Sequence, residues 1–210
     1  MCAGGRNVGR PVLDPRRGSA MSSDRHVYSP VVADLLEDDR LNELGPGTPD
    51  AARRDLLESL TPESIVAPAK LRDRDMALAC LAGLWLRFDF LDQSHTISQQ
   101  IHSPSGSYWH GIMHRREPDF GNAKYWFRQV GRHPVFEPLC AAAGELAAES
   151  DAGSAFSWLA EQTEWNPSDF VDACQGTIDE SSPSNTLCRR IQQAEWRLLF
   201  EYCHAAACGH

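Results

Sequence analysis

Histidine, carboxylate and basic side chains are concentrated between Ser103 and Pro134 of this 210-residue chain. Because an α-helix turns by about 100° per residue, His110, His114 and Glu117 share one helical face, within an arc of about 60°. Two imidazoles one turn apart can bind the same metal ion, and such pairs are typical of zinc sites. The spacing therefore predicts His110 and His114 as metal ligands, with a divalent ion such as zinc as the cofactor.

A third ligand and a base are needed before such an ion can do chemistry. His95, His102 and His133 all lie close enough in the sequence to complete the shell, and His133 is the predicted third ligand. Glu117 and Asp119 are the candidates for a general base that takes a proton from bound water. This set predicts a metal-dependent hydrolase or lyase. The structural alternative is that the histidines are hydrogen-bonded groups beside the core, since HxxxH without the glutamate of HExxH is a common pattern.

Basic side chains give the same stretch a local positive charge. Residues 108–134 contain five arginine or lysine residues and two carboxylates, whereas the whole chain has a formal net charge of -9. This favours a small anionic ligand or a protein segment as the partner, because arginine can hold an anionic group with two parallel hydrogen bonds. The residues that we predict to line this binding surface are His95, Tyr108, Arg115, Arg116, Asn122, Lys124, Tyr125 and Arg128.

Arg116 also has a structural interpretation. On a helix it falls between Trp109 and Ile112, on the apolar side. A buried charge without a partner is strongly destabilising, so an arginine at this position needs a carboxylate or carbonyl groups. The candidate partners nearby in the sequence are Asp89, Asp92 and Asp119.

The composition of the whole chain narrows the class of protein. An acidic pI of about 5.3 argues against nucleic acid or an anionic membrane surface as the partner. No run of 18 apolar residues is present, so no membrane span is predicted. Seven cysteines without a CxxC pair are typical of reduced thiols in a cytoplasmic protein. We expect residues 1–22 to be a disordered leader, with Met1 or Met21 as the start, and residues 23–210 to form one domain.

Apolar periodicity predicts an all-α fold, a single-domain helical bundle built from αα-hairpins. Convincing alternation of apolar and polar residues, the mark of strands, is absent from the sequence. Residues 72–90 are apolar almost all round and predict the most buried helix. The other predicted helices cover residues 29–44, 49–60, 94–101, 107–117, 119–131 and 136–149, two shorter helices, and a long closing helix that ends at residue 208 and begins with Ser184 or Asn185 as its cap.

Residues 107–131 predict two antiparallel helices joined by a tight turn, because Ser105 or Ser107 can cap the first helix and Pro118 ends it. The hairpin resembles one tetratricopeptide unit: small residues at Gly111 and Ala123 allow close packing, and the aromatic Phe127 and then a proline follow. The resemblance implies a helical interaction module. Histidines stand where such repeats usually place an aliphatic and an aromatic residue, and a third unit is not visible, so we do not expect a solenoid.

The same stretch is similar to a set of uncharacterised bacterial proteins. The shared text is YWHxIxHRRExD, found here at residues 108–119, and NxKYWFRxVGxHP, found at residues 122–134. This resemblance implies no particular activity. The sequence as a whole therefore predicts an intracellular helical binding protein whose basic, histidine-rich hairpin at residues 108–134 binds the ligand, with the metal-dependent enzyme as the alternative.

Overall fold

The computed structural model describes residues 28–179 and 181–210, and in these residues it has eleven α-helices, two short 3-10 helices and no strand. This confirms the predicted all-α class. The leader predicted at residues 1–22 lies outside the described residues. The helices are α1 (Pro30–Glu37), η1 (Ala51–Arg53), α2 (Arg54–Ser59), α3 (Pro62–Val66), α4 (Arg74–Arg87), α5 (Leu91–Ser98), α6 (Pro104–Arg116), α7 (Phe120–Val130), α8 (Phe136–Ala148), η2 (Ser154–Phe156), α9 (Trp158–Glu161), α10 (Pro167–Thr177) and α11 (Pro183–Cys208).

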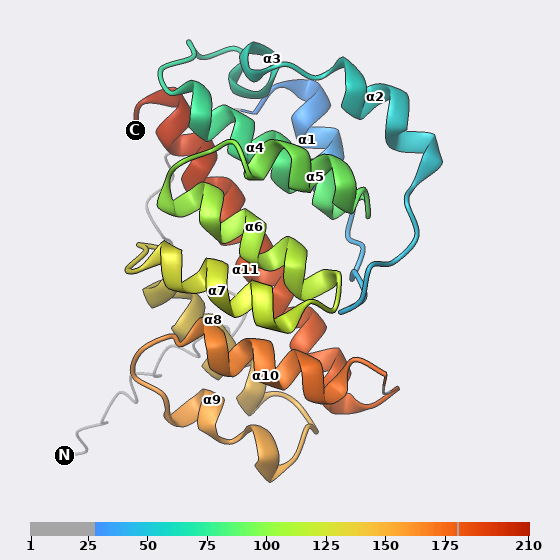
Figure 1. Cartoon of the computed structure of the whole chain (residues 1–210), viewed down its shortest axis with the longest axis vertical. Coiled ribbons are helices and arrows are strands. Elements are labelled where there is room, and N and C mark those ends of the chain that lie inside the picture. The colour runs from blue at the N-terminus through green and yellow to red at the C-terminus, as the bar shows by residue number, and fades with distance from the viewer. Residues whose placement is uncertain (1–27, 180) are drawn as a thin grey trace, which may run out of the picture.

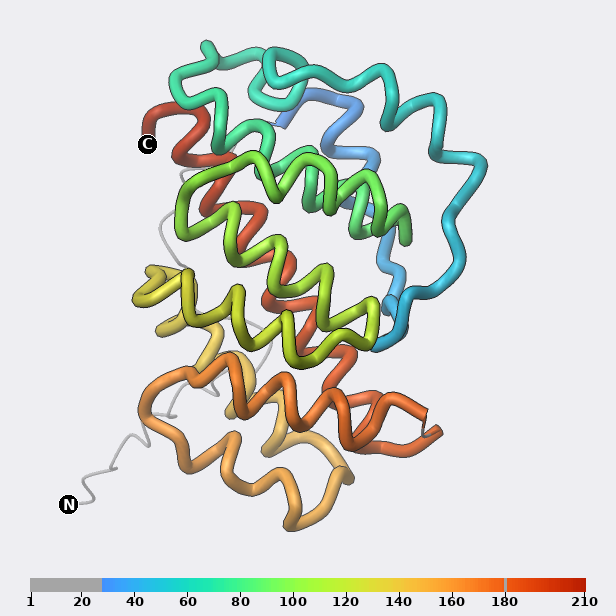
Figure 2. The backbone as a smooth tube through the Cα atoms, in the orientation of Figure 1, coloured from blue at the N-terminus to red at the C-terminus, as the bar shows by residue number. Residues whose placement is uncertain are grey.

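A row of helices backed by one long helix forms the architecture. Neighbours in the row are α4, α5, α6, α7 and α10, each in contact with the next. The long helix α11 crosses behind this row and packs against α4, α8 and α10 (Figures 1 and 2). One continuous hydrophobic core runs from Val32 in α1 to Ala207 in α11. Within the described segments, no helix is both long enough and apolar enough to cross a membrane.

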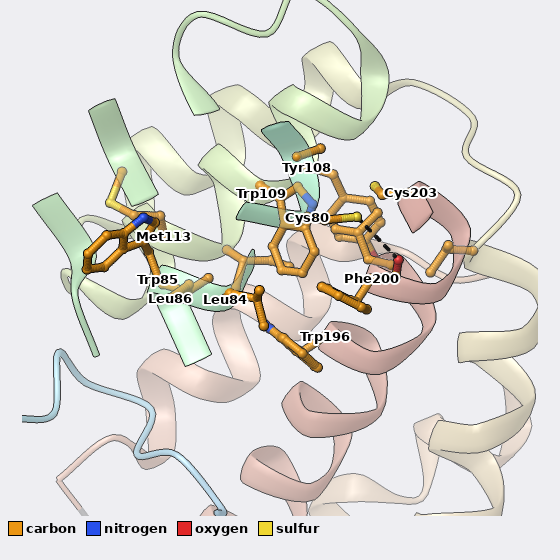
Figure 3. Packing of buried hydrophobic residues seen from close by; sticks show 14 of the residues in the cluster. Cys80, Leu84, Trp85, Leu86, Tyr108, Trp109, Met113, Trp196, Phe200 and Cys203 are labelled. Carbon is orange, nitrogen blue, oxygen red and sulfur yellow. Dashed lines mark hydrogen bonds between the residues drawn. The ribbon is translucent and has the colours of Figure 1, made fainter. Parts of the chain in front are cut away.

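The core is centred where α4 and α6 meet α11. As predicted, α4 is buried on nearly all sides. Trp109 of α6 and Trp196 of α11 meet edge to face, with ring centroids 6.2 Å apart (Figure 3). The Trp109 ring also packs on Gly83 of α4, where an added Cβ would come within 2.8 Å of the ring. A small residue is therefore required at this crossing, which anchors α6 on its buried side.

Several predicted helix ends are moved by local capping. The helix predicted at residues 29–44 ends at Glu37, because Asp38 is extended and binds Arg40 in the following irregular segment. Ser103 rather than Ser105 or Ser107 caps α6. In the same way, Ser182 caps α11, one turn ahead of the helix start that we predicted from Ser184 or Asn185. In both cases a proline occupies the first turn after the capping serine, where its fixed φ suits a helix start.

The hairpin of α6 and α7 is present. Pro118 follows directly on the end of α6, and the Asp119 carboxylate caps α7 by accepting a hydrogen bond from the Asn122 backbone N–H at 3.1 Å. A Cβ added at Gly111 would lie 3.2 Å from the Phe127 ring, and Ala123 is fully buried. These contacts confirm the predicted close approach of the two helices, so the residues of α7 are held directly against α6.

Candidate metal centre

Three histidine rings come together between α5 and α6. His110 and His114 lie one turn apart on α6, and His95 approaches them from α5, which packs beside α6. The ring centroids are 4.7 Å apart for His95 and His110, 4.7 Å for His110 and His114, and 5.3 Å for His95 and His114. One potential ligand atom from each residue lies within 4.8 Å of the others. Among the described residues, only these three form such a group.

Ser98 lies beside the His110 ring. Its hydroxyl oxygen is 3.1 Å from His110 Nδ1 and 3.3 Å from the His95 carbonyl oxygen. When the hydroxyl donates to that carbonyl, its oxygen accepts from Nδ1 and the lone pair of His110 is on Nε2. The ring itself is 2% exposed and is covered on one face by Trp126 of α7, with centroids 4.1 Å apart.

The proton on the His114 ring is assigned by Glu117. The Glu117 carboxylate, which can only accept, lies 3.0 Å from His114 Nδ1. The lone pair of His114 is therefore also on Nε2. A carboxylate bound to the far nitrogen of a metal-binding histidine is a recurring arrangement in metalloproteins, because it fixes the ring and makes the ligand nitrogen more basic.

Asn122 of α7 covers the face of the His114 ring. Its Nδ2 atom is 3.0 Å from His114 Nε2 and 3.4 Å from Nδ1. An atom in the ring plane cannot be this close to both nitrogens without colliding with Cε1, the carbon between them. The amide therefore lies above the ring and does not occupy the in-plane lone pair of Nε2. Trp126 over His110 and Asn122 over His114 hold the two rings by their faces, which leaves the ligand edges available.

Burial keeps His110 and His114 neutral. Burial, followed by the neighbouring His114 and His95, lowers the pKa of His110 to about 3. Burial also lowers the pKa of His114, although Glu117 acts in the opposite direction. Neutral imidazole is the form that binds a metal ion, so these two histidines are ready to bind one at neutral pH.

The geometry is close to that of a zinc site. With Zn–N bonds of about 2.0–2.1 Å, ligand nitrogens in a tetrahedral shell lie about 3.3–3.4 Å apart. The observed upper limit of 4.8 Å means that the donor atoms must move closer by up to about 1.5 Å to bind one zinc ion. Imidazole nitrogens also suit copper, iron and nickel.

His133, the predicted third ligand, lies elsewhere. Its Nε2 is 3.1 Å from the Ser105 hydroxyl and its Nδ1 accepts the Val135 backbone N–H at 3.2 Å. Both ring nitrogens are therefore engaged, and the ring packs edge-on against Tyr108 with centroids 5.2 Å apart. The structure brings His95 to the cluster in its place.

The two arginines predicted to hold an anion are buried in ion pairs. Arg115 binds Glu195 of α11 at 2.5 Å and is fully buried. Arg116 binds Asp89 at 2.7 Å and donates to the carbonyl oxygens of Gly45 and Leu86 at 3.0 Å each. The structural interpretation of Arg116, with Asp89 as its partner, is therefore confirmed.

The remaining predicted binding residues do not form one surface with the histidines. Tyr108 is fully buried. Lys124 pairs with Asp172 of α10 at 2.5 Å, and the exposed Tyr125 lies under Arg128, with 5.9 Å from the guanidinium carbon to the ring centroid. Of the two predicted bases, Glu117 contacts His114, whereas Asp119 caps α7.

Trp126 and Ser98 were missed as site residues, although for Trp126 a signal was available. In an antiparallel hairpin, residues equally distant from the turn face each other. Asn122 and Trp126 stand four and eight residues after Pro118, and His114 and His110 stand four and eight residues before it. The position of Ser98 depends on how α5 packs on α6, for which the sequence carries no comparable signal.

Comparison with protein-family models, with curated proteins and with solved structures finds no match to this chain.

Proposed function

We propose that this protein binds one divalent transition-metal ion, with zinc as the first candidate, through His95 and the Nε2 atoms of His110 and His114. The observation that carries the proposal is the convergence of three histidine donor atoms within 4.8 Å. The Glu117 carboxylate beside His114 Nδ1 supports it, because it directs the lone pair of this ring to Nε2. The reduced thiols expected from the cysteine pattern support a cytoplasmic location for the proposed centre.

The charges around the cluster favour a cation over the anion that the sequence suggested. Two carboxylates, Glu117 and Asp119, act on His114, and so does the third histidine, His95. Arg115 and Arg116, which gave the stretch much of its positive charge, are neutralised by Glu195 and Asp89. An incoming metal ion therefore meets imidazoles with negative charge nearby, an arrangement that stabilises bound positive charge.

Metal analysis tests the proposal directly. The protein is purified without a histidine tag, stripped of metal, reloaded with zinc and analysed by mass spectrometry of the elements and by titration calorimetry. We expect one zinc ion per chain and a rise in melting temperature, because an ion that binds only the folded state stabilises it.

His95→Ala is the informative variant, because His95 is only half-buried and its removal disturbs the core least. We expect it to weaken zinc binding by at least about 100-fold, as one of three protein ligands is lost. His102→Ala is the matched control, since His102 is exposed and lies just before α6. Zinc binding that is absent from the original protein, or that is lost equally in both variants, would contradict the proposal.

A further inference from the structure

The histidine cluster offers three protein ligands where a closed structural site would have four. Structural zinc sites are almost always completed by four protein side chains, whereas catalytic sites have three and keep one position for water or substrate. In the described part of the chain, the group of possible ligands ends with His95, His110 and His114. The hydroxyl of Ser98 and the carboxylate of Glu117 are each within hydrogen-bond distance of a histidine Nδ1, so they support ligands instead of adding one.

The edge of the cluster reaches the molecular surface. His110 and His114 are 2% and 6% exposed, but His95, Asn122 and Trp126 are each only half-buried. The Glu117 side chain is 35% exposed. The side of the cluster nearest to solvent is therefore the side of His95.

The surroundings of this edge select against anions. The carboxylates Glu117 and Asp119 act on His114, and the neighbouring Arg115 and Arg116 point to partners in other elements. The indole of Trp126 adds an apolar wall beside His110. A phosphate ester would be repelled here, whereas a neutral carbonyl compound would not.

We propose that the ion keeps one exchangeable position at the His95 edge, where it binds water and hydrolyses neutral carboxylic esters. This inference rests on the proposed metal binding at the same three histidines. A zinc ion held by three histidines lowers the pKa of its bound water to about 7, which supplies hydroxide at neutral pH without a protein base.

The reaction needs no oxidant or further reactant. Bound water gives one proton to the solvent, and the remaining hydroxide oxygen attacks the carbonyl carbon while the π electron pair moves to the carbonyl oxygen. When that pair returns, the bond between the carbonyl carbon and the ester oxygen breaks. The alkoxide or phenolate leaves with the bonding pair and takes the proton of the new carboxyl group, the carboxylate dissociates, and water replaces it. The sum is ester plus water giving carboxylate, alcohol and the one proton that bound water released.

Glu117 is a positioning residue in this scheme. Its Oε2 atom accepts the Nδ1 proton of His114, which holds the ring with Nε2 toward the ion. Asp119 is committed to the N-terminus of α7 and takes no part. The sequence suggested both carboxylates as bases. In the structure Glu117 supports the ligand His114, and Asp119 supports the start of α7.

Cobalt replacement separates an open site from a closed one. The cobalt-loaded protein is titrated with imidazole, a neutral ligand, and its visible spectrum is recorded. We expect the spectrum to shift as imidazole enters the free position. A protein that binds one cobalt ion but shows no shift has a closed centre. That result overturns the open position and leaves the proposed metal binding intact, whereas a protein that binds no metal fails both.

Substrate class is tested with 4-nitrophenyl acetate and 4-nitrophenyl phosphate. We expect the zinc-loaded protein and His102→Ala to hydrolyse the acetate at least about tenfold faster than the metal-free protein or zinc-treated His95→Ala. We expect the phosphate to be hydrolysed more slowly than the acetate. Equal acetate rates with and without zinc would overturn the activity, and faster hydrolysis of the phosphate would overturn the neutral substrate class.

Discussion

Helix α6 buries arginine side chains on one side and histidine side chains on another, and the two kinds of side chain have different partners. Arg115 and Arg116 point to carboxylates on other elements, at 2.5 Å and 2.7 Å, and their charges are neutralised. His110 and His114 are about as well buried, yet a donor atom of each lies within 4.8 Å of the other and of one from His95. Burial alone therefore does not mark a functional residue. The two faces differ in whether the surrounding fold supplies an oppositely charged partner for the buried side chain, as it does for Arg115 and Arg116.

The largest expected effect concerns the arginine face, where Glu195→Ala leaves Arg115 charged and unpaired in the core. We expect the free energy of unfolding to fall by about 3–5 kcal/mol, because a buried charge loses its partner. Zinc affinity of the folded protein should be unchanged. Urea denaturation and zinc titration of the same sample measure the two quantities.

The matched control for Glu195→Ala is the double variant Arg115→Met with Glu195→Leu. Replacing a buried ion pair by apolar residues of similar size is often close to neutral, so we expect most of the lost stability to return. If Glu195→Ala costs under about 1 kcal/mol, the arginine face is not held by this pair and the comparison between the two faces fails.

The second effect concerns the histidine face, where Glu117→Gln removes the carboxylate that accepts from His114. We expect zinc affinity to fall by about 10- to 100-fold, as is usual when the partner of a ligand histidine is changed. The stability of the metal-free protein should change by under about 1 kcal/mol, since the Glu117 side chain is partly exposed. Calorimetric zinc titration and urea denaturation provide both values.

Asp119→Ala is the control variant, for which we expect a change in stability and none in zinc affinity. Asp119 caps α7, so its loss should cost about 1 kcal/mol of stability and leave zinc affinity within about twofold. A fall in affinity for this variant as large as that of Glu117→Gln would mean that general negative charge, and not the bond to His114, supports the site.

The pH response also separates histidine from arginine, because of the two only histidine titrates in the accessible range. Burial lowers the pKa of His110 to about 3 and that of His133 to about 4, against about 6.5 in the unfolded chain. Below pH 6.5 the unfolded chain therefore binds more protons than the folded one. The contribution of these two neutral histidines to the free energy of unfolding should be fully present above pH 6.5. The free energy of unfolding of the metal-free protein should fall as the pH drops toward 4.

Urea denaturation from pH 7 to pH 4.5 measures this slope. His133→Gln should make the slope shallower by up to about one proton, because one of the buried neutral rings is removed. Arg115→Met with Glu195→Leu should leave the histidine contribution in place. A slope that is flat between pH 6.5 and 5 in the original protein would show that the buried histidines do not stay neutral.

Local sequence rules predicted the helical framework of the site well. Pro118 marks the end of α6, Asp119 caps α7, and Gly111 and Ala123 allow the close crossing, as expected. These features depend on residues within one or two turns, so the sequence contains the information directly. The capping residues of α6 and α11 were missed by a few positions, because several serines in each stretch could serve.

His110, His114 and Glu117 share a face because of helical periodicity, a property of the local backbone that can be read from the sequence. That His95 joins them depends on how α5 packs on α6, which is set by the folded chain. The folded chain likewise brings Arg115 to Glu195, 80 residues away in the sequence. Partners this distant are chosen by the packing of the whole core, where every buried charge must be neutralised, and no local pattern in the sequence records that choice.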